Sequence, residues 1–217
     1  MFNCIPILVE SCGALSGGSA FLVKDGETVA LVTAAHVAPR AQPTDAWASW
    51  PKSVTARLPS GGQVELILFE DRNLSSGGTA WSPAFLWRPT GRGDGSIEDI
   101  LILNGGVNFE AIESLASEYP VFELPENLVL NSSSPLRIFG YPVDVDMWPE
   151  EVEVEGRFIR VNGRMIEADL ISREGHSGGP CLDDRGNLVG MIIGSNQDHE
   201  AAARIVPATE ITSLLKP

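Results

Sequence analysis

The sequence predicts an all-β fold of two six-stranded antiparallel β-barrels followed by a C-terminal helix. Short apolar runs are punctuated by 22 glycines and 15 prolines, which is typical of all-β sandwiches and barrels. The runs number about six in each half, without the internal repeat that marks a solenoid. The one strong helical pattern, ATEITSLLK, follows Pro207 at the end of the chain. We therefore expect a single domain with an N-terminal barrel over residues 1–115, a C-terminal barrel over 116–206 and a helix over 207–217.

The strands expected in the first half are rich in Val, Ile, Leu and Phe and are bounded by turn-forming residues. They are Ile5–Val9, Ser19–Lys24, Val29–Thr33, Val54–Leu58 and Val64–Phe69. The segment KDGE between the second and third of these predicts a hairpin turn, because Asp-Gly suits the backbone of a tight turn. Residues 71–98 are rich in Gly, Ser, Pro and Thr and predict a long surface insertion, in which only AFLWR resembles an ordered element.

The second half begins with the apolar run DILIL and a polar, potentially helical stretch over Phe109–Ala116. The strand pattern then resumes. The expected strands are Leu136–Gly140, Val152–Val161, Met165–Ile171, Pro180–Leu182, Leu188–Ile193 and Arg204–Val206.

Composition and charge exclude several functions. Fifteen basic and 29 acidic residues give a net charge of −14, which would repel a phosphate backbone, so we expect no nucleic-acid partner. No run approaches the ~18 apolar residues of a membrane span, and the start MFNCIPILVE lacks a basic leader, so we expect neither a membrane partner nor export. The three cysteines, Cys4, Cys12 and Cys181, form no C-x-x-C pair. This pattern favours reduced thiols and a cytoplasmic location, although a Cys4–Cys12 pair stays open.

Three segments carry residues suited to acyl transfer by a serine. LVTAAHV places His36 after a strand, IEDILIL places Asp99 at the start of one, and REGHSGGP places Ser177 in a glycine-rich loop. A serine hydroxyl is a weak nucleophile at neutral pH and needs a histidine to take its proton. The histidine in turn needs a carboxylate that holds its tautomer. Each residue alone would more often be structural, but their joint occurrence predicts a catalytic triad.

The order of these residues along the chain separates two classes of hydrolase. The sequence GHSGG also fits the G-x-S-x-G elbow of α/β-hydrolases, which place an acid and then a histidine after the serine. Only forty residues follow Ser177, and His199 is the sole histidine among them. No βαβ pattern precedes the serine, so the order His36, Asp99, Ser177 disfavours that class.

The three segments resemble the motifs T-A-A-H, D-I-x-x-L and G-x-S-G-G-P of the trypsin-like, chymotrypsin-fold serine peptidases. The resemblance extends from about Gly17 to the terminal helix and is closest to short bacterial, HtrA-like peptidase domains without a PDZ domain. It implies that His36 is the general base, Asp99 its orienting carboxylate and Ser177 the nucleophile. It also implies that the backbone N–H groups of Gly175 and Ser177 form an oxyanion hole.

The same resemblance implies where a peptide would bind. The base of the pocket for the residue before the scissile bond (P1) falls six positions ahead of Ser177, at Ile171. The strand ending with Ile193, Gly194 and Ser195 is expected to pair with the substrate backbone, with the last two residues at the pocket rim. Because isoleucine offers no charge partner, we expect a preference for apolar or small P1 residues.

Two departures from the family pattern bear on regulation. Val37 stands where secreted members carry a cysteine, and His176 stands where digestive members carry the aspartate that pairs with a newly cut amino terminus. The zymogen switch is therefore not expected, which leaves any control to a regulatory protein partner or to rearrangement of the loop around Ser177. Three scattered histidines predict no metal, and we expect no cofactor. The expected function is a serine endopeptidase acting on a peptide or protein; the alternatives are an idle peptide-binding module and a serine esterase.

Overall fold

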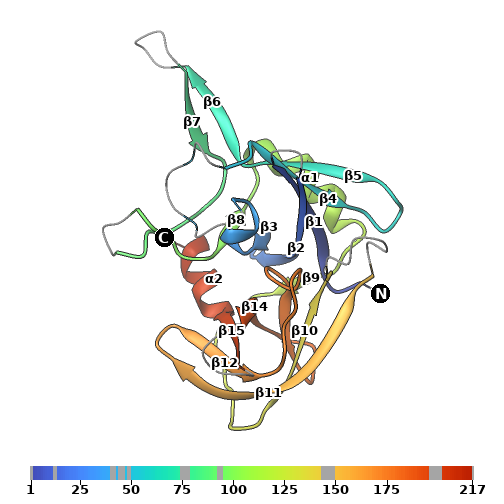
Figure 1. Cartoon of the computed structure of the whole chain (residues 1–217), viewed down its shortest axis with the longest axis vertical. Coiled ribbons are helices and arrows are strands. Elements are labelled where there is room, and N and C mark those ends of the chain that lie inside the picture. The colour runs from blue at the N-terminus through green and yellow to red at the C-terminus, as the bar shows by residue number, and fades with distance from the viewer. Residues whose placement is uncertain are drawn as a thin grey trace.

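The computed structural model describes residues 2–11, 14–39, 43, 47, 50–73, 79–91, 95–142, 150–195 and 202–216. Its strands form two halves that lie one above the other in Figure 1, with helix α2 (Ala208–Leu215) beside their junction. The prediction of a mostly β, chymotrypsin-like fold with a C-terminal helix is confirmed.

The C-terminal half is a closed, six-stranded antiparallel barrel with the strand order β10-β11-β12-β15-β14-β13. Alternate residues of these strands face the barrel interior, among them Ile138, Ile166, Cys181 and Ile205, all essentially without exposed surface. The strands are β10 (Pro135–Gly140), β11 (Val152–Asn162), β12 (Met165–Asp169), β13 (Pro180–Asp183), β14 (Leu188–Ser195) and β15 (Ala202–Pro207).

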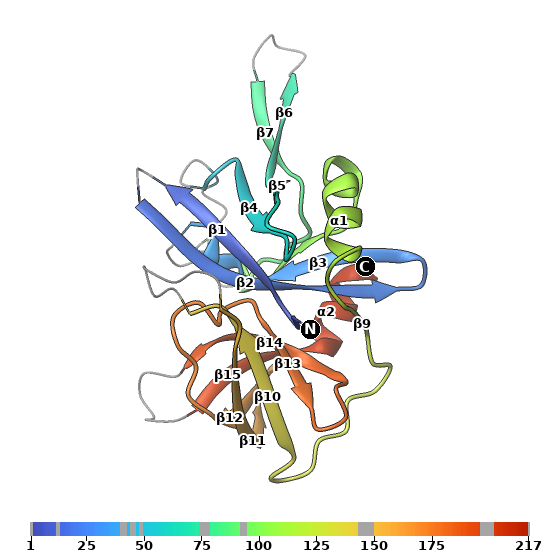
Figure 2. The ribbon, with the colours of Figure 1, turned by 90° about the vertical axis from the view of Figure 1, so that its right-hand side faces the viewer.

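The N-terminal half is a strongly curled sheet with the path β5-β4-β1-β2-β3-β8, and β9 pairs parallel to β2 off this path. Within the described residues the end strands β5 and β8 do not pair, so this half is a half-barrel. Figure 2 shows it as the layer above the closed barrel. Its strands are β1 (Ile5–Ser11), β2 (Ala14–Asp25), β3 (Thr28–Thr33), β4 (Ser53–Arg57), β5 (Gln63–Ile67), β8 (Leu101–Leu103) and β9 (Val121–Glu123).

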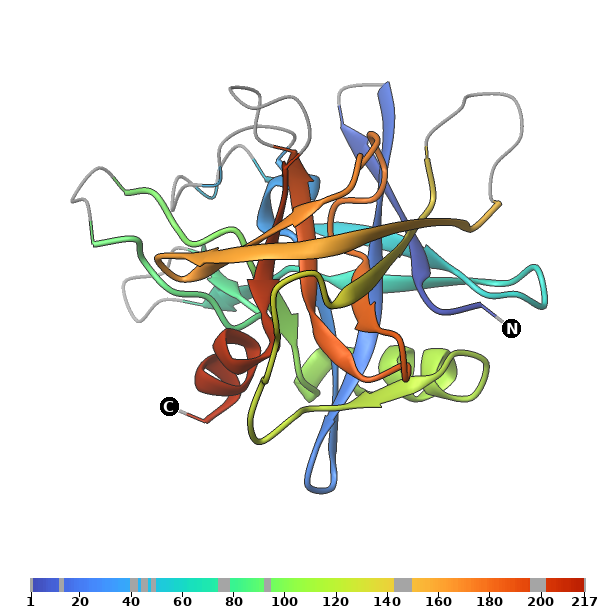
Figure 3. The ribbon, with the colours of Figure 1, turned by 90° about the horizontal axis from the view of Figure 1, so that it is seen from below.

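The boundary between the halves lies beyond the helix α1 (Phe109–Ala116), which was expected from the sequence. Strand β9 follows the predicted boundary at residue 115 and still belongs to the N-terminal sheet. The connection that follows then runs to Pro135, where the barrel begins. Seen from below, this connection passes along the barrel on its way from β9 to β10 (Figure 3).

The prediction of a long surface insertion over 71–98, ordered only at AFLWR, is wrong in one respect, because these residues form most of a hairpin. Strands β6 (Phe69–Asn73) and β7 (Thr79–Pro83) pair only with each other and project from the body of the molecule (Figures 1 and 2). Their sequences, FEDRN and TAWSP, lack the apolar alternation of a half-buried strand. AFLWR, by contrast, contributes a single bridge, between Leu86 and Ile102.

Aromatic side chains fill the space under this hairpin. Trp50 is 4% exposed and stacks on Phe85, and Trp47 packs edge-on against Trp50, Phe85 and Trp87. Edge-to-face and offset contacts are the favourable geometries for aromatic rings. The tryptophans that follow His36 therefore belong to the core of the N-terminal half.

A network of charged side chains joins the two halves beside Asp99. Arg88 contacts both Glu98 (2.8 Å) and Glu210 of α2 (3.0 Å). Arg164, from the turn between β11 and β12, contacts the same two carboxylates, at 2.7 Å for Glu98. Burial alone would raise the pKa of Glu210, but the hydrogen bond from Arg164 and the two guanidinium charges lower it below its usual range.

No helix in the described part of the chain is long and apolar enough to span a bilayer.

We predict that Glu210→Gln lowers the free energy of unfolding by about 1 kcal/mol at pH 7, because it leaves two arginines with one carboxylate. Urea unfolding measures this change. The matched control is Glu126→Gln, which neutralises an exposed loop carboxylate. Equal stabilities for the two variants would show that the network does not stabilise the fold.

Candidate active site

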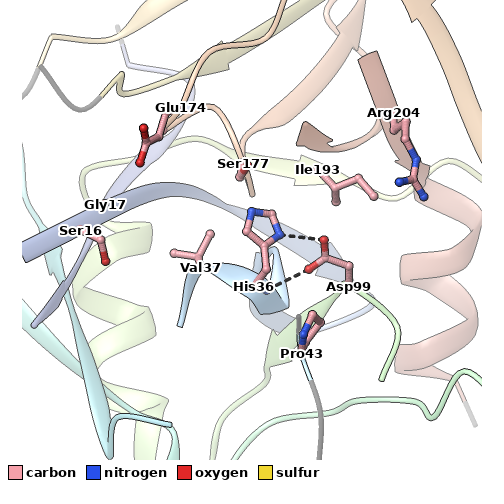
Figure 4. Close-up of a pocket in the computed structure, with 11 residues that line it drawn as sticks. Ser16, Gly17, His36, Val37, Pro43, Asp99, Glu174, Ser177, Ile193 and Arg204 are labelled. Carbon is pink, nitrogen blue, oxygen red and sulfur yellow. Dashed lines mark hydrogen bonds and ion pairs between the residues drawn. The ribbon is translucent and has the colours of Figure 1, made fainter. Parts of the chain in front are cut away.

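A cavity at the junction of the two halves contains the side chains that the sequence singles out (Figure 4). His36 and Asp99 come from the N-terminal half, and Ser177 and Ile193 from the C-terminal barrel. The lining consists of Ser16, Gly17, His36, Val37, Pro43, Asp99, Glu174, Gly175, Ser177, Ile193 and Arg204.

His36 and Asp99 are locked together by two hydrogen bonds. The backbone N–H of His36 donates to Asp99 Oδ1 at 2.9 Å, and His36 Nδ1 lies 2.7 Å from Asp99 Oδ2. An acceptor at Nδ1 fixes the tautomer in which Nδ1 carries the proton and Nε2 is free to accept one. In Figure 4 that second ring nitrogen lies on the side of the imidazole facing Ser177.

Local backbone structure sets the positions of both residues. His36 lies in the short 3₁₀ helix η1 (Ala35–Val37), directly after the buried strand β3. Asp99 lies in a tight turn, closed by the hydrogen bond from the N–H of Ile100 to the carbonyl of Glu98 (2.8 Å). The Glu98 N–H donates to the Arg88 carbonyl (2.8 Å), so the turn is held by backbone and by the charged network together.

The glycines around Ser177 let its loop pack directly against neighbouring backbone. A Cβ on Gly178 would lie 2.0 Å from the carbonyl oxygen of Ser19, and one on Gly175 would lie 2.1 Å from that of Tyr141. Both residues also have φ in the left-handed region, at +86° and +96°. The GHSGG sequence is therefore a requirement of close packing as well as of the turn.

Ser19, at 0% exposure, holds this loop with every polar group it has. Its N–H donates to the carbonyl of Ser177 (2.8 Å), and its hydroxyl donates to the carbonyl of Gly175 (2.7 Å). The same hydroxyl accepts the N–H of Tyr141 (3.0 Å), and its carbonyl accepts the hydroxyl of Thr33 (2.8 Å). One residue of β2 thus fixes two carbonyls of the Ser177 loop and links them to β3 and to Tyr141, which directly follows β10.

Two backbone donors beside Ser177 have no acceptor within the described chain. The carbonyl of His176 accepts the N–H of Gly179 (2.9 Å), and a trans peptide directs its N–H, that of Ser177, the opposite way. The N–H groups of Gly175 and Ser177 donate no hydrogen bond to any atom of the described chain. Both residues line the cavity, so an anionic oxygen there could accept from both.

The structure does not gather all the predicted substrate-binding residues in the cavity. Ile193 lines it, but the side chain of Ile171 is 66% exposed and lies outside the lining. Gly194 and Ser195 end β14 next to Ile193 without entering the described lining. Leu170, directly after β12, is buried in the barrel core, whereas Ile171 is exposed, so the described cavity lends no support to Ile171 as the base of the P1 pocket.

Two residues of the site were missed by the sequence analysis. Ser19 lies in the segment SGGSAFLV, and the sequence signal for a site residue there is a small polar side chain next to two glycines. Arg204 begins the last predicted strand, and a cation in an otherwise apolar strand was the signal there.

The cysteines do not compete with Ser177 as nucleophiles in the described chain. Cys4 and Cys181 are free and buried. Burial raises the pKa of both thiols well above the usual range, which disfavours the reactive thiolate. Because Cys4 is free, the Cys4–Cys12 pair that the sequence left open is not formed; Cys12 itself lies outside the described residues, as does His199. No three His, Cys, Asp or Glu side chains of the described residues are grouped as metal ligands would be.

His176 is fully buried behind the serine and does not line the cavity. Its Nδ1 lies 3.2 Å from the backbone nitrogen of Arg173, and its Cα would be 2.6 Å from a Cβ placed on Gly140. Burial, assisted by the charge of Arg173, lowers the pKa of His176 despite opposing backbone hydrogen bonds. Its position supports a packing role inside the loop.

We predict that acid destabilises the protein through His176. Its folded-state pKa is lowered, so below about pH 6.5 the unfolded chain takes up a proton that the folded chain resists, and stability falls. Between pH 7.5 and 5.5 the loss attributable to His176 should approach about 1 kcal/mol.

Urea unfolding of the wild type and of His176→Gln at the two pH values measures this loss. The variant should show the smaller difference between the two pH values. Identical differences would mean that His176 is protonated equally well in the folded state.

Comparison with known proteins supports the fold and identifies the family. The sequence profile of the family described as "Trypsin-like peptidase domain" matches residues 18–191. Among solved structures, the serine endoprotease from Yersinia pestis is 16% identical with a TM-score of 0.63, over 99% of this chain and 61% of its own. The active form of the Rv3671c protease from M. tuberculosis is 17% identical with a TM-score of 0.59, over 98% of this chain and 79% of its own.

A third similar structure is the HtrA-type protease AlgW crystallised with a tripeptide. It is 14% identical with a TM-score of 0.62, over 99% of this chain and 59% of its own. This chain thus spans about three fifths of the length of the Yersinia and AlgW chains. At these identities the structures establish the shared fold, whereas the profile match over most of the sequence establishes the family. The chain belongs to the family of trypsin-like peptidase domains.

Proposed function

We propose that this protein is a serine endopeptidase that uses Ser177, His36 and Asp99 as a catalytic triad. The observation that carries the proposal is the pair of hydrogen bonds between His36 and Asp99 in the same cavity as Ser177. This pair prepares an imidazole whose free nitrogen can take a proton.

The reaction follows from the roles of the three side chains. Ser177 Oγ attacks the carbonyl carbon of the scissile peptide bond while His36 Nε2 takes the hydroxyl proton. The C–N bond then breaks, and the imidazolium gives that proton to the leaving amine, which leaves an ester on Ser177. Water attacks the ester with His36 again as base, and the acid product and free Ser177 are released. Asp99 stays ionised and stabilises the imidazolium in both steps.

The N–H groups of Gly175 and Ser177 supply the oxyanion hole in this proposal. Each tetrahedral intermediate carries a negatively charged oxygen. Removing one preorganised hydrogen-bond donor to such an oxygen raises the activation free energy by roughly 3–4 kcal/mol. Ser19 is the positioning residue for this hole, because it holds the carbonyls of both residues.

The substrate in this proposal is a peptide or protein that binds beside β14. Strand β14 pairs with β13 as far as Met191, and Ile192 still exchanges backbone hydrogen bonds with Gly178 and Gly179, so the unpaired edge of the described strand begins at Ile193. An added peptide strand can therefore use its free edge. The AlgW structure holds a tripeptide, which supports a peptide as the substrate class. The preference for apolar or small P1 residues expected from the sequence rests on Ile171, which lies outside the described cavity lining, so no P1 class is proposed from that residue.

Two further parts of the proposal rest on the sequence. A reducing, cytoplasmic compartment is proposed from the scarcity of cysteines. Control by a regulatory partner, without cleavage of the amino terminus, is proposed because His176 replaces the aspartate of the zymogen switch.

We predict that a fluorophosphonate probe modifies Ser177 in the intact protein, because activated serines react with it. Intact mass spectrometry and peptide mapping locate the adduct. Ser177→Ala should abolish labelling and lower kcat for peptide hydrolysis by about 10⁴–10⁶-fold with little change in stability. Asp99→Asn should also lose peptide hydrolysis, because His36 then adopts the wrong tautomer.

The outcomes separate the competing functions. Labelling with ester hydrolysis but no peptide hydrolysis would indicate an esterase. An unlabelled but folded protein would indicate an idle peptide-binding module, and labelling that persists in Ser177→Ala would remove Ser177 from the nucleophile's role.

We predict that Ser19→Ala lowers kcat by about 10- to 100-fold while KM changes much less. Loss of the hydroxyl frees the Gly175 carbonyl and leaves a buried Tyr141 N–H without its acceptor, so the oxyanion loop is no longer fixed. Steady-state kinetics and thermal unfolding, measured together, separate positioning from simple loss of fold.

The control for this prediction is Ser114→Ala, which removes a hydroxyl bonded to its own helix backbone. It should leave kcat unchanged. A Ser19→Ala enzyme that is folded and retains its full kcat would contradict the positioning role.

A further inference from the structure

We propose that Arg204 makes the acyl side of the cavity selective for a peptide with a glutamate or aspartate at P1. This inference rests on the proposed peptidase function and names its substrate class. Arg204 lines the cavity and Ile171 does not, so the P1 preference is inferred here from the arginine.

The charged groups of the cavity are unevenly distributed around Ser177. Three of the described lining residues carry charge: Asp99, Glu174 and Arg204. Asp99 is engaged by His36. In Figure 4, Glu174 and Arg204 lie on opposite sides of Ser177, and the Arg204 guanidinium lies on the side of Ile193. The arginine is thus the single cation of the described lining, in a protein whose net charge is −14.

The barrel directs this arginine outward and leaves its charge unpaired within the described chain. Its neighbours Ala203 and Ile205 point into the barrel core, so Arg204 faces the opposite way. The carboxylate directly across on β12 is Glu167, which is occupied by Arg160 (2.6 Å) and Asn162 (2.8 Å). Arg204 itself makes no ion pair with a described residue, in contrast to Arg88 and Arg164.

The opposite strand leaves the space beside Arg204 open. The residue of β14 that pairs with Arg204 is Gly194, which follows a register shift after Ile192. A Cβ at Gly194 would meet no atom within 4 Å, and φ of +121° there favours glycine. The strand expected to bind the substrate therefore places no side chain over the arginine at this point.

These features fit a carboxylate ligand. A guanidinium can donate two parallel hydrogen bonds to a carboxylate, which gives both orientation and charge stabilisation. The resemblance to the trypsin-like peptidases places P1 at the rim formed by the end of β14, next to Arg204. The C-terminal carboxylate of an endopeptidase substrate belongs to the leaving-group side, so the ligand is an acidic P1 side chain.

The test compares amidated peptides that differ only at P1, with Glu, Gln, Asp, Leu or Lys. The measured quantity is kcat/KM. We expect the wild type to cleave after Glu about tenfold or more faster than after its neutral isostere Gln. Arg204→Gln should bring this ratio close to one, and Arg204→Glu should favour Lys. Thermal unfolding of each variant confirms that it is folded.

Arg157→Gln is the matched control, because it removes an exposed β11 cation outside the cavity lining. The Glu/Gln ratio of this variant should equal that of the wild type.

Fluorophosphonate labelling, run in parallel on the wild type, separates two kinds of failure. Normal labelling with Leu preferred over Glu, or a Glu/Gln ratio unaffected by Arg204→Gln, would overturn the role of Arg204 and leave the peptidase proposal intact. A preference seen only with free C-terminal carboxylates would also overturn it. Absence of labelling and of cleavage would overturn both proposals.

Discussion

The structure of the site depends on one buried hydroxyl that joins the two halves of the molecule. Ser19 comes from the N-terminal sheet, yet it binds the carbonyls of Gly175 and Ser177 in a loop of the C-terminal barrel. Glycines at 175 and 178 permit the contact, since any side chain there would strike backbone oxygen atoms. A buried hydroxyl with donor and acceptor both used is a strong constraint, because each lost bond leaves a desolvated polar group. The loop around Ser177 is therefore held by the partner half on both sides of the peptide that carries the Ser177 N–H.

The second contact between the halves acts on the other side of the site. Glu98 precedes Asp99 and is held by Arg88 and Arg164. Asp99 in turn orients His36 through two hydrogen bonds. Ser177 and His36, the proposed nucleophile and base, thus belong to different halves. Ser19 of the N-terminal sheet holds the Ser177 loop, whereas the turn that carries Asp99 is tied to the C-terminal half through Arg164 and Glu210. The alignment of nucleophile and base depends on how the halves pack, which explains why the charged network and Ser19 matter to chemistry in which they take no part.

The sequence predicts the features that arise from short stretches of chain. Short apolar runs bounded by turn-forming residues located the barrel strands, and the segments around His36, Asp99 and Ser177 placed three residues that share one cavity. The β6-β7 hairpin was missed because its strands pair with each other away from the core, so their sequences carry little apolar alternation. Ile171 was placed by counting positions, and its exposure depends on the path of the chain after β12, which no local pattern specifies. The position of Arg204 depends on a register shift between Ile192 and Gly194, and the role of Ser19 on contacts with residues more than 120 positions away.

The central claim is that the folded chain already holds an oxyanion hole beside an activated serine. A crystal structure of the full chain treated with a peptide boronate tests it most directly, because boron bonded to Ser177 Oγ places an oxygen where the oxyanion would form. The account predicts a covalent adduct whose oxygen accepts hydrogen bonds from the N–H groups of Gly175 and Ser177, with the Ser19–Gly175 bond unchanged. An adduct whose oxygen contacts neither N–H group, or a loop that releases Ser19 in order to bind, would contradict it.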